Sequence, residues 1–130
     1  MDMNQQLSEH FNRREFSCKG CRWKSTCPHG HGYGQGLATV DAGLLILLED
    51  TRTNFGRPMT ITSGQRCPQH NESQNGAKRS QHLLGTAADI QVAGVPALEV
   101  YKYLDAFHEG GLGRYGSFTH VDVRNARRRF

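Results

Sequence analysis

The chain has 130 residues, of which 36% are hydrophobic and 15 are glycine, and its formal net charge is +4. This length is enough for one domain with a hydrophobic core and too short for two. No apolar run approaches the ~20 residues that a membrane-spanning helix needs, and residues 1–6 carry neither the basic nor the apolar region of a secretory signal. We therefore expect one domain over residues 1–130, synthesised in the cytoplasm and without a membrane span.

The first 38 residues form a polar segment with three cysteines, Cys18, Cys21 and Cys27. Together with Cys67 and nearby histidines, these thiols could hold a second, structural zinc ion, although the spacing from Cys21 to Cys27 is not that of a standard finger. A disulfide and reduced thiols are the alternatives that the sequence leaves open.

A first helix is expected from about Val40 to Asn54, with Thr39 as its N-cap and Gly56 just past its end. Its core-facing stripe is expected to contain Val40, Leu44, Leu47, Leu48 and Thr51.

Short strands are expected at residues 59–62 and 87–92, and a closing hairpin is expected from residues 112–115 and 118–123. A second helix should start near Pro96 and run to about His108. Its core-facing side chains should be Val100, Tyr103, Leu104 and Phe107. These elements predict an α+β fold with a small antiparallel sheet flanked by helices.

Alternation along the strands gives three polar residues a common direction. Asp89 lies on the strand face opposite Ile90, and His120 and Asp122 lie on the face opposite Val121. If the two strands are neighbours, the side chains of Asp89 and His120 would enter the same cleft.

His82 precedes Asp89 by seven residues, and the glycine between them lets the chain fold back. His82, Asp89 and His120 would then offer two imidazoles and a carboxylate, a set that suits a catalytic zinc with an open fourth position. The alternative is that each histidine is an ordinary surface or structural residue, and spacing alone does not decide between them.

Motifs around these residues resemble those of a known enzyme family. Residues 62–71, read as TSGQRCPQHN, and residues 80–90, read as SQHLLGTAADI, are similar to the zinc D-alanyl-D-alanine carboxypeptidase family, peptidase family M-15. Residues 110–115 and 118–124 resemble the ending of a short branch found in phage lysis and tail genes. The resemblance covers roughly residues 7–128 and implies the fold shared by DD-peptidases and the hedgehog signalling domain.

The resemblance also implies roles for individual residues. His82, Asp89 and His120 match the zinc ligands of the family, and Arg66 matches an arginine beside the scissile carbonyl. A guanidinium there would stabilise the developing oxyanion or hold a substrate carboxylate.

One position departs from the family pattern. Many relatives carry a carboxylate three residues before the last histidine as general base, and here that position is Ser117. Asp122 is our candidate replacement, either as base or as a partner that orients an imidazole. His70 is a weaker candidate for the base.

These features imply a zinc-dependent peptidoglycan peptidase that cuts stem peptides or cross-links, either D-Ala-D-Ala carboxypeptidase-like or an endolysin-type endopeptidase. We expect a monomer that acts on the cell wall, which it could reach with the help of a holin. The alternative is a zinc-stabilised wall-binding or phage structural module of the same fold without turnover, which Ser117 favours.

A nucleic-acid binder is a third reading, based on the cysteines and on the basic residues Arg124, Arg127, Arg128 and Arg129. Few aromatic residues alternate with these arginines, so we expect no nucleic-acid partner.

Overall fold

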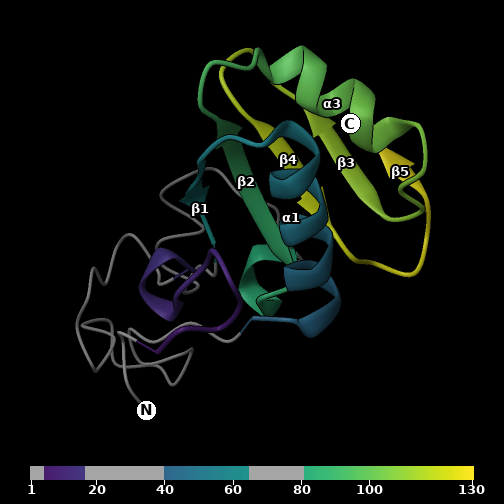
Figure 1. Cartoon of the computed structure of the whole chain (residues 1–130). Coiled ribbons are helices and arrows are strands. Elements are labelled where there is room, and N and C mark those ends of the chain that lie inside the picture. The colour runs from purple at the N-terminus through teal and green to yellow at the C-terminus, as the bar shows by residue number, and fades with distance from the viewer. Residues whose placement is uncertain (1–4, 17–39, 65–80) are drawn as a thin grey trace.

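The computed structural model describes residues 5–16, 40–64 and 81–130 (Figure 1). A five-stranded sheet with the order β1-β2-β4-β3-β5 forms the centre of this part of the chain. The strands are β1 (Met59–Ser63), β2 (Ala87–Val92), β3 (Gly111–Arg114), β4 (Thr119–Asp122) and β5 (Arg128–Arg129). Two α-helices accompany the sheet, which confirms the expected α+β class.

The sheet is mixed, whereas the sequence predicted an antiparallel one. β1 pairs with β2, β2 with β4 and β3 with β4 in antiparallel fashion, but β5 lies parallel to β3. The expected hairpin is present as β3 and β4. The last, two-residue strand was not predicted, because an arginine-rich pair carries no alternating pattern.

Helix α1 spans Ala42–Phe55. The carboxylate of Asp41 accepts a hydrogen bond from the backbone N–H of Leu44 at 3.1 Å, so Asp41 is the N-cap. Gly56 ends the helix in the left-handed region at φ 62°, which a residue without Cβ adopts easily. The predicted N-cap at Thr39 was therefore wrong, because Asp41 takes that place two residues further on.

Helix α3 spans Ala97–Asp105 and begins directly after Pro96. It ends three residues earlier than predicted. The N–H of Phe107 bonds to the carbonyl of Leu104 at 3.2 Å, an i to i−3 contact that tightens the last turn, and the chain then leaves the helix. Phe107, expected in the core, is 44% exposed for this reason.

Both helices contribute to one hydrophobic core with the same face of the sheet. α1 supplies Leu44 and Leu48, and α3 supplies Val100 and Leu104. The strand residues in this cluster include Ile61, Ala88, Ile90, Val92, Leu112 and Val121. Val40, Leu47 and Tyr103, which were predicted to face the core, are only partly buried at its margin.

Because the core takes one face of β2 and β4, side chains at the alternate positions lie on the other face. Asp89, His120 and Asp122 occupy these positions, as predicted. Among the helices that the structure describes, none has both the length and the apolar character needed to cross a membrane.

Candidate metal centre

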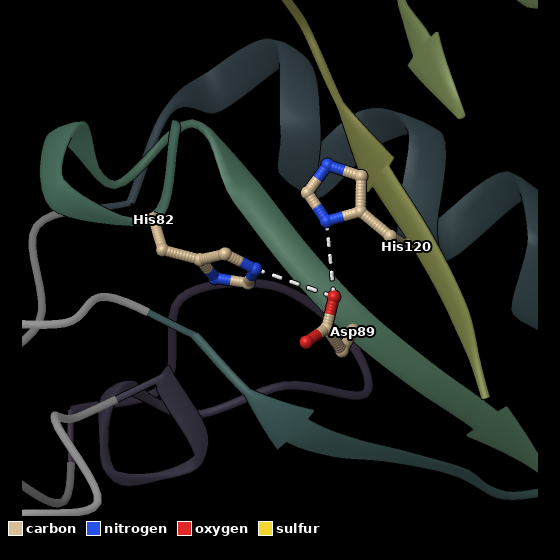
Figure 2. A group of neighbouring side chains, drawn as sticks. All are labelled: His82, Asp89 and His120. Atoms are coloured by element: carbon tan, nitrogen blue, oxygen red, sulfur yellow. Dashed lines mark hydrogen bonds and ion pairs between the residues drawn. The ribbon is translucent and has the colours of Figure 1, made fainter. Parts of the chain in front are cut away.

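Three side chains from separate segments meet on this second face of the sheet. His82, Asp89 and His120 each offer one ligand atom, and these atoms all lie within 4.8 Å of one another. Asp89 on β2 is the direct register partner of His120 on β4. Figure 2 shows both imidazoles directed at the same carboxylate oxygen of Asp89. The structure thus brings together the three residues that the sequence singled out.

His82 lies in η3 (Gln81–Leu84), a short 3₁₀ helix just before β2. Its Nδ1 lies 2.7 Å from the carbonyl oxygen of Gly64, which can only accept, so Nδ1 carries the hydrogen. In the neutral ring, Nε2 then has the lone pair, and it lies 3.3 Å from Oδ1 of Asp89. Two acceptors at this distance need a proton or a cation between them.

His120 has a carboxylate at each ring nitrogen. Nε2 lies 2.7 Å from Oδ2 of Asp122, and Nδ1 lies 3.0 Å from Oδ1 of Asp89. If Nε2 donates to Asp122, Nδ1 of the neutral ring presents its lone pair toward Asp89 and His82. A cation held between these groups would then contact Nε2 of His82, Oδ1 of Asp89 and Nδ1 of His120.

The pKa shifts describe two carboxylates that stay charged at neutral pH. Burial alone would raise the pKa of Asp89, but hydrogen bonds from His120 and His82 outweigh it and lower that pKa to about 2. The pKa of Asp122 is lowered despite burial, because His120 and Arg124 bond to its charged form. Burial would lower the pKa of His120, but hydrogen bonds to Asp122 and Asp89 raise it. A metal cation would take the place of a proton here.

The donor set fits zinc. Zinc accepts imidazole nitrogen and carboxylate oxygen, and sites with three protein ligands leave a fourth position for water or substrate. The hydrogen bond from His82 to Gly64 and the one between His120 and Asp122 are of the kind that orients metal-bound imidazoles.

Asp122 is fully buried and has several donors around its carboxylate. Oδ1 accepts from the backbone N–H of Gly111 at 3.1 Å and from Nε of Arg124 at 2.8 Å. Oδ2 accepts from Nη2 of Arg124 and contacts His120, both at 2.7 Å. A Cβ on Gly111 would collide with this carboxylate, so the glycine provides the room for it.

The remaining predicted residues divide into two groups. Ser117 lies in the exposed turn between β3 and β4, where its carbonyl accepts a 2.8 Å hydrogen bond from the side chain of Gln91. The candidates Arg66 and His70 lie outside the described residues. So do the four cysteines, Cys18, Cys21, Cys27 and Cys67, and the structural zinc site stays a prediction.

Two residues of the site were not predicted from the sequence. Arg124 was counted only as part of a basic run. It lies two residues after Asp122, just past the end of β4, and continued alternation along the chain could have indicated their contact. Gly64 contributes a backbone carbonyl to His82 from 18 residues away, and no sequence pattern signals such a contact.

Comparison with known proteins identifies the family of this chain. The family model described as Peptidase M15 matches residues 9–122. The chain is 31% identical over 94 residues to the probable peptidoglycan L,D-endopeptidase MepK of Haemophilus influenzae, covering 65% of this chain and 50% of that protein. It is 29% identical over 100 residues to the peptidoglycan L,D-endopeptidase MepK of Escherichia coli K12, covering 70% and 55%.

The chain therefore belongs to the peptidase M15 family, and the predicted resemblance is confirmed. It spans about half the length of the curated relatives that it matches. The short phage-type branch within the family stays a prediction.

Proposed function

We propose that this protein is a zinc-dependent peptidase that hydrolyses peptide bonds of peptidoglycan. One observation carries the proposal: the ligand atoms of His82, Asp89 and His120 converge within 4.8 Å in a chain of the peptidase M15 family. The two relatives named as peptidoglycan L,D-endopeptidases support the substrate class.

The metal ligands in this proposal are Nε2 of His82, Oδ1 of Asp89 and Nδ1 of His120. Zinc bound there would supply a Lewis acid for the scissile carbonyl and would lower the pKa of a bound water toward neutrality. The carboxylate of Asp89 already has a pKa of about 2, so it is charged and ready to bind a cation at neutral pH.

Asp122 has the role of a positioning residue in this proposal. Its oxygens contact His120, Arg124 and Gly111, and its side chain is 0% exposed. A general base must reach the proton that it removes, either directly or through one water. Of the two roles that the sequence left open, the geometry therefore favours orienting His120 over serving as the base. The role of Arg66 beside the carbonyl stays a prediction.

The relatives favour endopeptidase cleavage over removal of a terminal D-alanine, because both are named L,D-endopeptidases. We propose that cleavage occurs in the stem peptides or their cross-links, at the cell wall. Action as a monomer and access through a holin stay predictions.

The test is digestion of purified muropeptides with release of new amino groups as the readout. Metal-free protein should release none, addition of zinc should restore release, and His82→Ala should stay inactive with zinc present. His10→Ala is the matched control, because His10 bonds to Glu49 and not to the metal cluster. Zinc-loaded wild-type protein that leaves all muropeptides intact over a range of pH would refute the proposal.

A second candidate is a wall-binding module of the same fold that does not turn over substrate. Ser117 at the position of the expected base, together with the buried and fully engaged Asp122, favours it. This module would bind zinc and sediment with insoluble peptidoglycan while releasing no amino groups, whereas the peptidase would do both.

A further inference from the structure

The ring of Phe130 lies against the candidate metal ligand His120. Their ring centroids are 5.5 Å apart and their planes meet at 88°, an edge-to-face contact. The ring of His82 also lies edge-to-face with the His120 imidazole, with 5.2 Å between the ring centroids. Phe130 is 48% exposed, so it presents an aromatic surface directly beside the metal centre.

Phe130 reaches this place because of how β5 pairs with β3. Arg128 pairs with Gly111 and Arg129 with Leu112, and the N–H of Phe130 continues the ladder to the carbonyl of Leu112 at 3.0 Å. Arg129 bonds to Asp105 at the end of the α3 helix, so it lies on the helix-covered face of the sheet. Alternation then places Arg128 and Phe130 on the face of the metal centre.

Gly113 leaves space for Tyr115 and His120, and Phe130 lies at contact distance from the same position. A Cβ on Gly113 would lie 3.0 Å from Cβ of His120, 2.8 Å from Cε2 of Tyr115 and 3.5 Å from Cδ2 of Phe130. The rings of Tyr115 and Phe130 therefore both lie close to Gly113 and give an aromatic surface next to His120.

Arg128 adds a positive charge to this aromatic surface. Its guanidinium carbon lies 5.3 Å from the centroid of the Phe130 ring, within the range of a cation–π contact. The side chain is exposed. A guanidinium held over a ring is partly pre-organised for a forked hydrogen bond to a carboxylate.

The other arginines of the basic run already have acidic partners. Arg124 bonds to Asp122, while Arg127 and Arg129 bond to Asp105. Within the described segments, Arg128 forms no ion pair of this kind. Among the four arginines of the basic run, Arg128 is therefore the one whose charge is available to a ligand.

We propose that Arg128, held over Phe130, binds a free carboxylate of the peptide substrate next to the metal centre. The inference rests on the proposed function, because stem peptides of peptidoglycan carry free carboxylates along their length. Through this binding, Arg128 and Phe130 would form a specificity subsite that prefers peptides with free carboxylates to amidated ones.

The test is calorimetric binding of two stem tripeptides to the zinc-loaded protein, one with free carboxylates and one with the same carboxylates amidated. Wild-type protein should bind the acidic peptide about two- to fivefold more tightly at low salt, as expected for one partly exposed charge pair. Arg128→Gln should lose most of this preference, and the zinc ion would account for what remains. Arg128→Lys should keep part of the preference, because it keeps the charge but not the planar fork.

Arg57→Gln is the matched control. Arg57 is also exposed, but its guanidinium lies beside Gly94 in the turn after β2, and this variant should keep the full preference. An undiminished preference in Arg128→Gln, or no preference in the wild type, would overturn the subsite. Because binding is measured without turnover, a protein that prefers the acidic peptide but cuts no muropeptide would support the subsite and refute the peptidase.

Discussion

Asp122 contacts Nε2 of His120 at 2.7 Å, and this contact directs Nδ1 of the same ring toward Asp89. One buried carboxylate thus selects which nitrogen of the imidazole is available to a metal. Arg124 and the N–H of Gly111 fix that carboxylate from the other side. The geometry of the candidate metal centre therefore depends on a residue that is not itself one of the candidate ligands.

Asp122→Asn tests whether this residue positions His120 or acts as a base. An amide in place of the carboxylate weakens the hold on the imidazole, and loss of such a partner typically lowers metal affinity about 10- to 100-fold. We expect zinc affinity, measured by competition with a chelator, to fall by this factor, and activity to return in part at saturating zinc. A base would behave differently, with unchanged zinc affinity and activity that no zinc concentration restores.

Gly111→Ala should disturb the same carboxylate from the backbone side. A methyl group there overlaps the Asp122 side chain, and such overpacking costs about 1–3 kcal/mol of unfolding free energy. We expect lower thermal stability and weaker zinc binding together. Gly116→Ala is the control, because nothing lies within 4 Å of a Cβ at Gly116. Equal behaviour of the two variants would show that Asp122 does not need this space.

Metal analysis of variants separates the two candidate zinc sites. His82→Ala should lose one equivalent of zinc relative to the wild type, because it removes one of three ligands, and His10→Ala should lose none. Cys18→Ala tests the cysteine segment in the same experiment. A further equivalent lost in Cys18→Ala would establish a second site, and unchanged stoichiometry and stability would remove it from consideration.

Tyr103 links the α3 helix to the α1 helix through a 2.6 Å hydrogen bond to Asp50. Burial and this hydrogen bond raise the pKa of Tyr103 to about 12. Because the pKa is higher in the folded state, the stabilising contribution is complete below the ordinary value of about 10 and is lost as pH rises toward 12.

Denaturant unfolding of Tyr103→Phe at several pH values tests this linkage. The variant should be about 1 kcal/mol less stable than the wild type at pH 8, the usual net effect of one hydrogen bond. The difference should shrink as pH rises from 10 to 12. A difference that stays constant over this range would mean that the phenol does not bond to Asp50 in solution.

Strand alternation predicted the common face of Asp89 and His120, because one buried face fixes the direction of every second side chain. The same rule placed Asp122 beside His120, but it left open what that contact does. The answer depends on Arg124 and Gly111, which surround the carboxylate, and single-strand patterns do not report such neighbours.

Other features depend on contacts that are distant in sequence. The pairing of β5 with β3 and the hydrogen bond from His82 to Gly64 join segments about 17 and 18 residues apart without a local signal. Helix boundaries differed from the prediction by one to three residues, because caps such as Asp41 are chosen among several adjacent candidates by the packing of the whole helix.

Mass spectrometry of muropeptides after incubation with the zinc-loaded protein tests the central claim most directly. The account predicts new fragments from cleavage at one peptide bond type, their absence with metal-free protein or with His82→Ala, and their presence with His10→Ala. Unchanged muropeptides with zinc-loaded wild-type protein, or equal cleavage by His82→Ala, would contradict it.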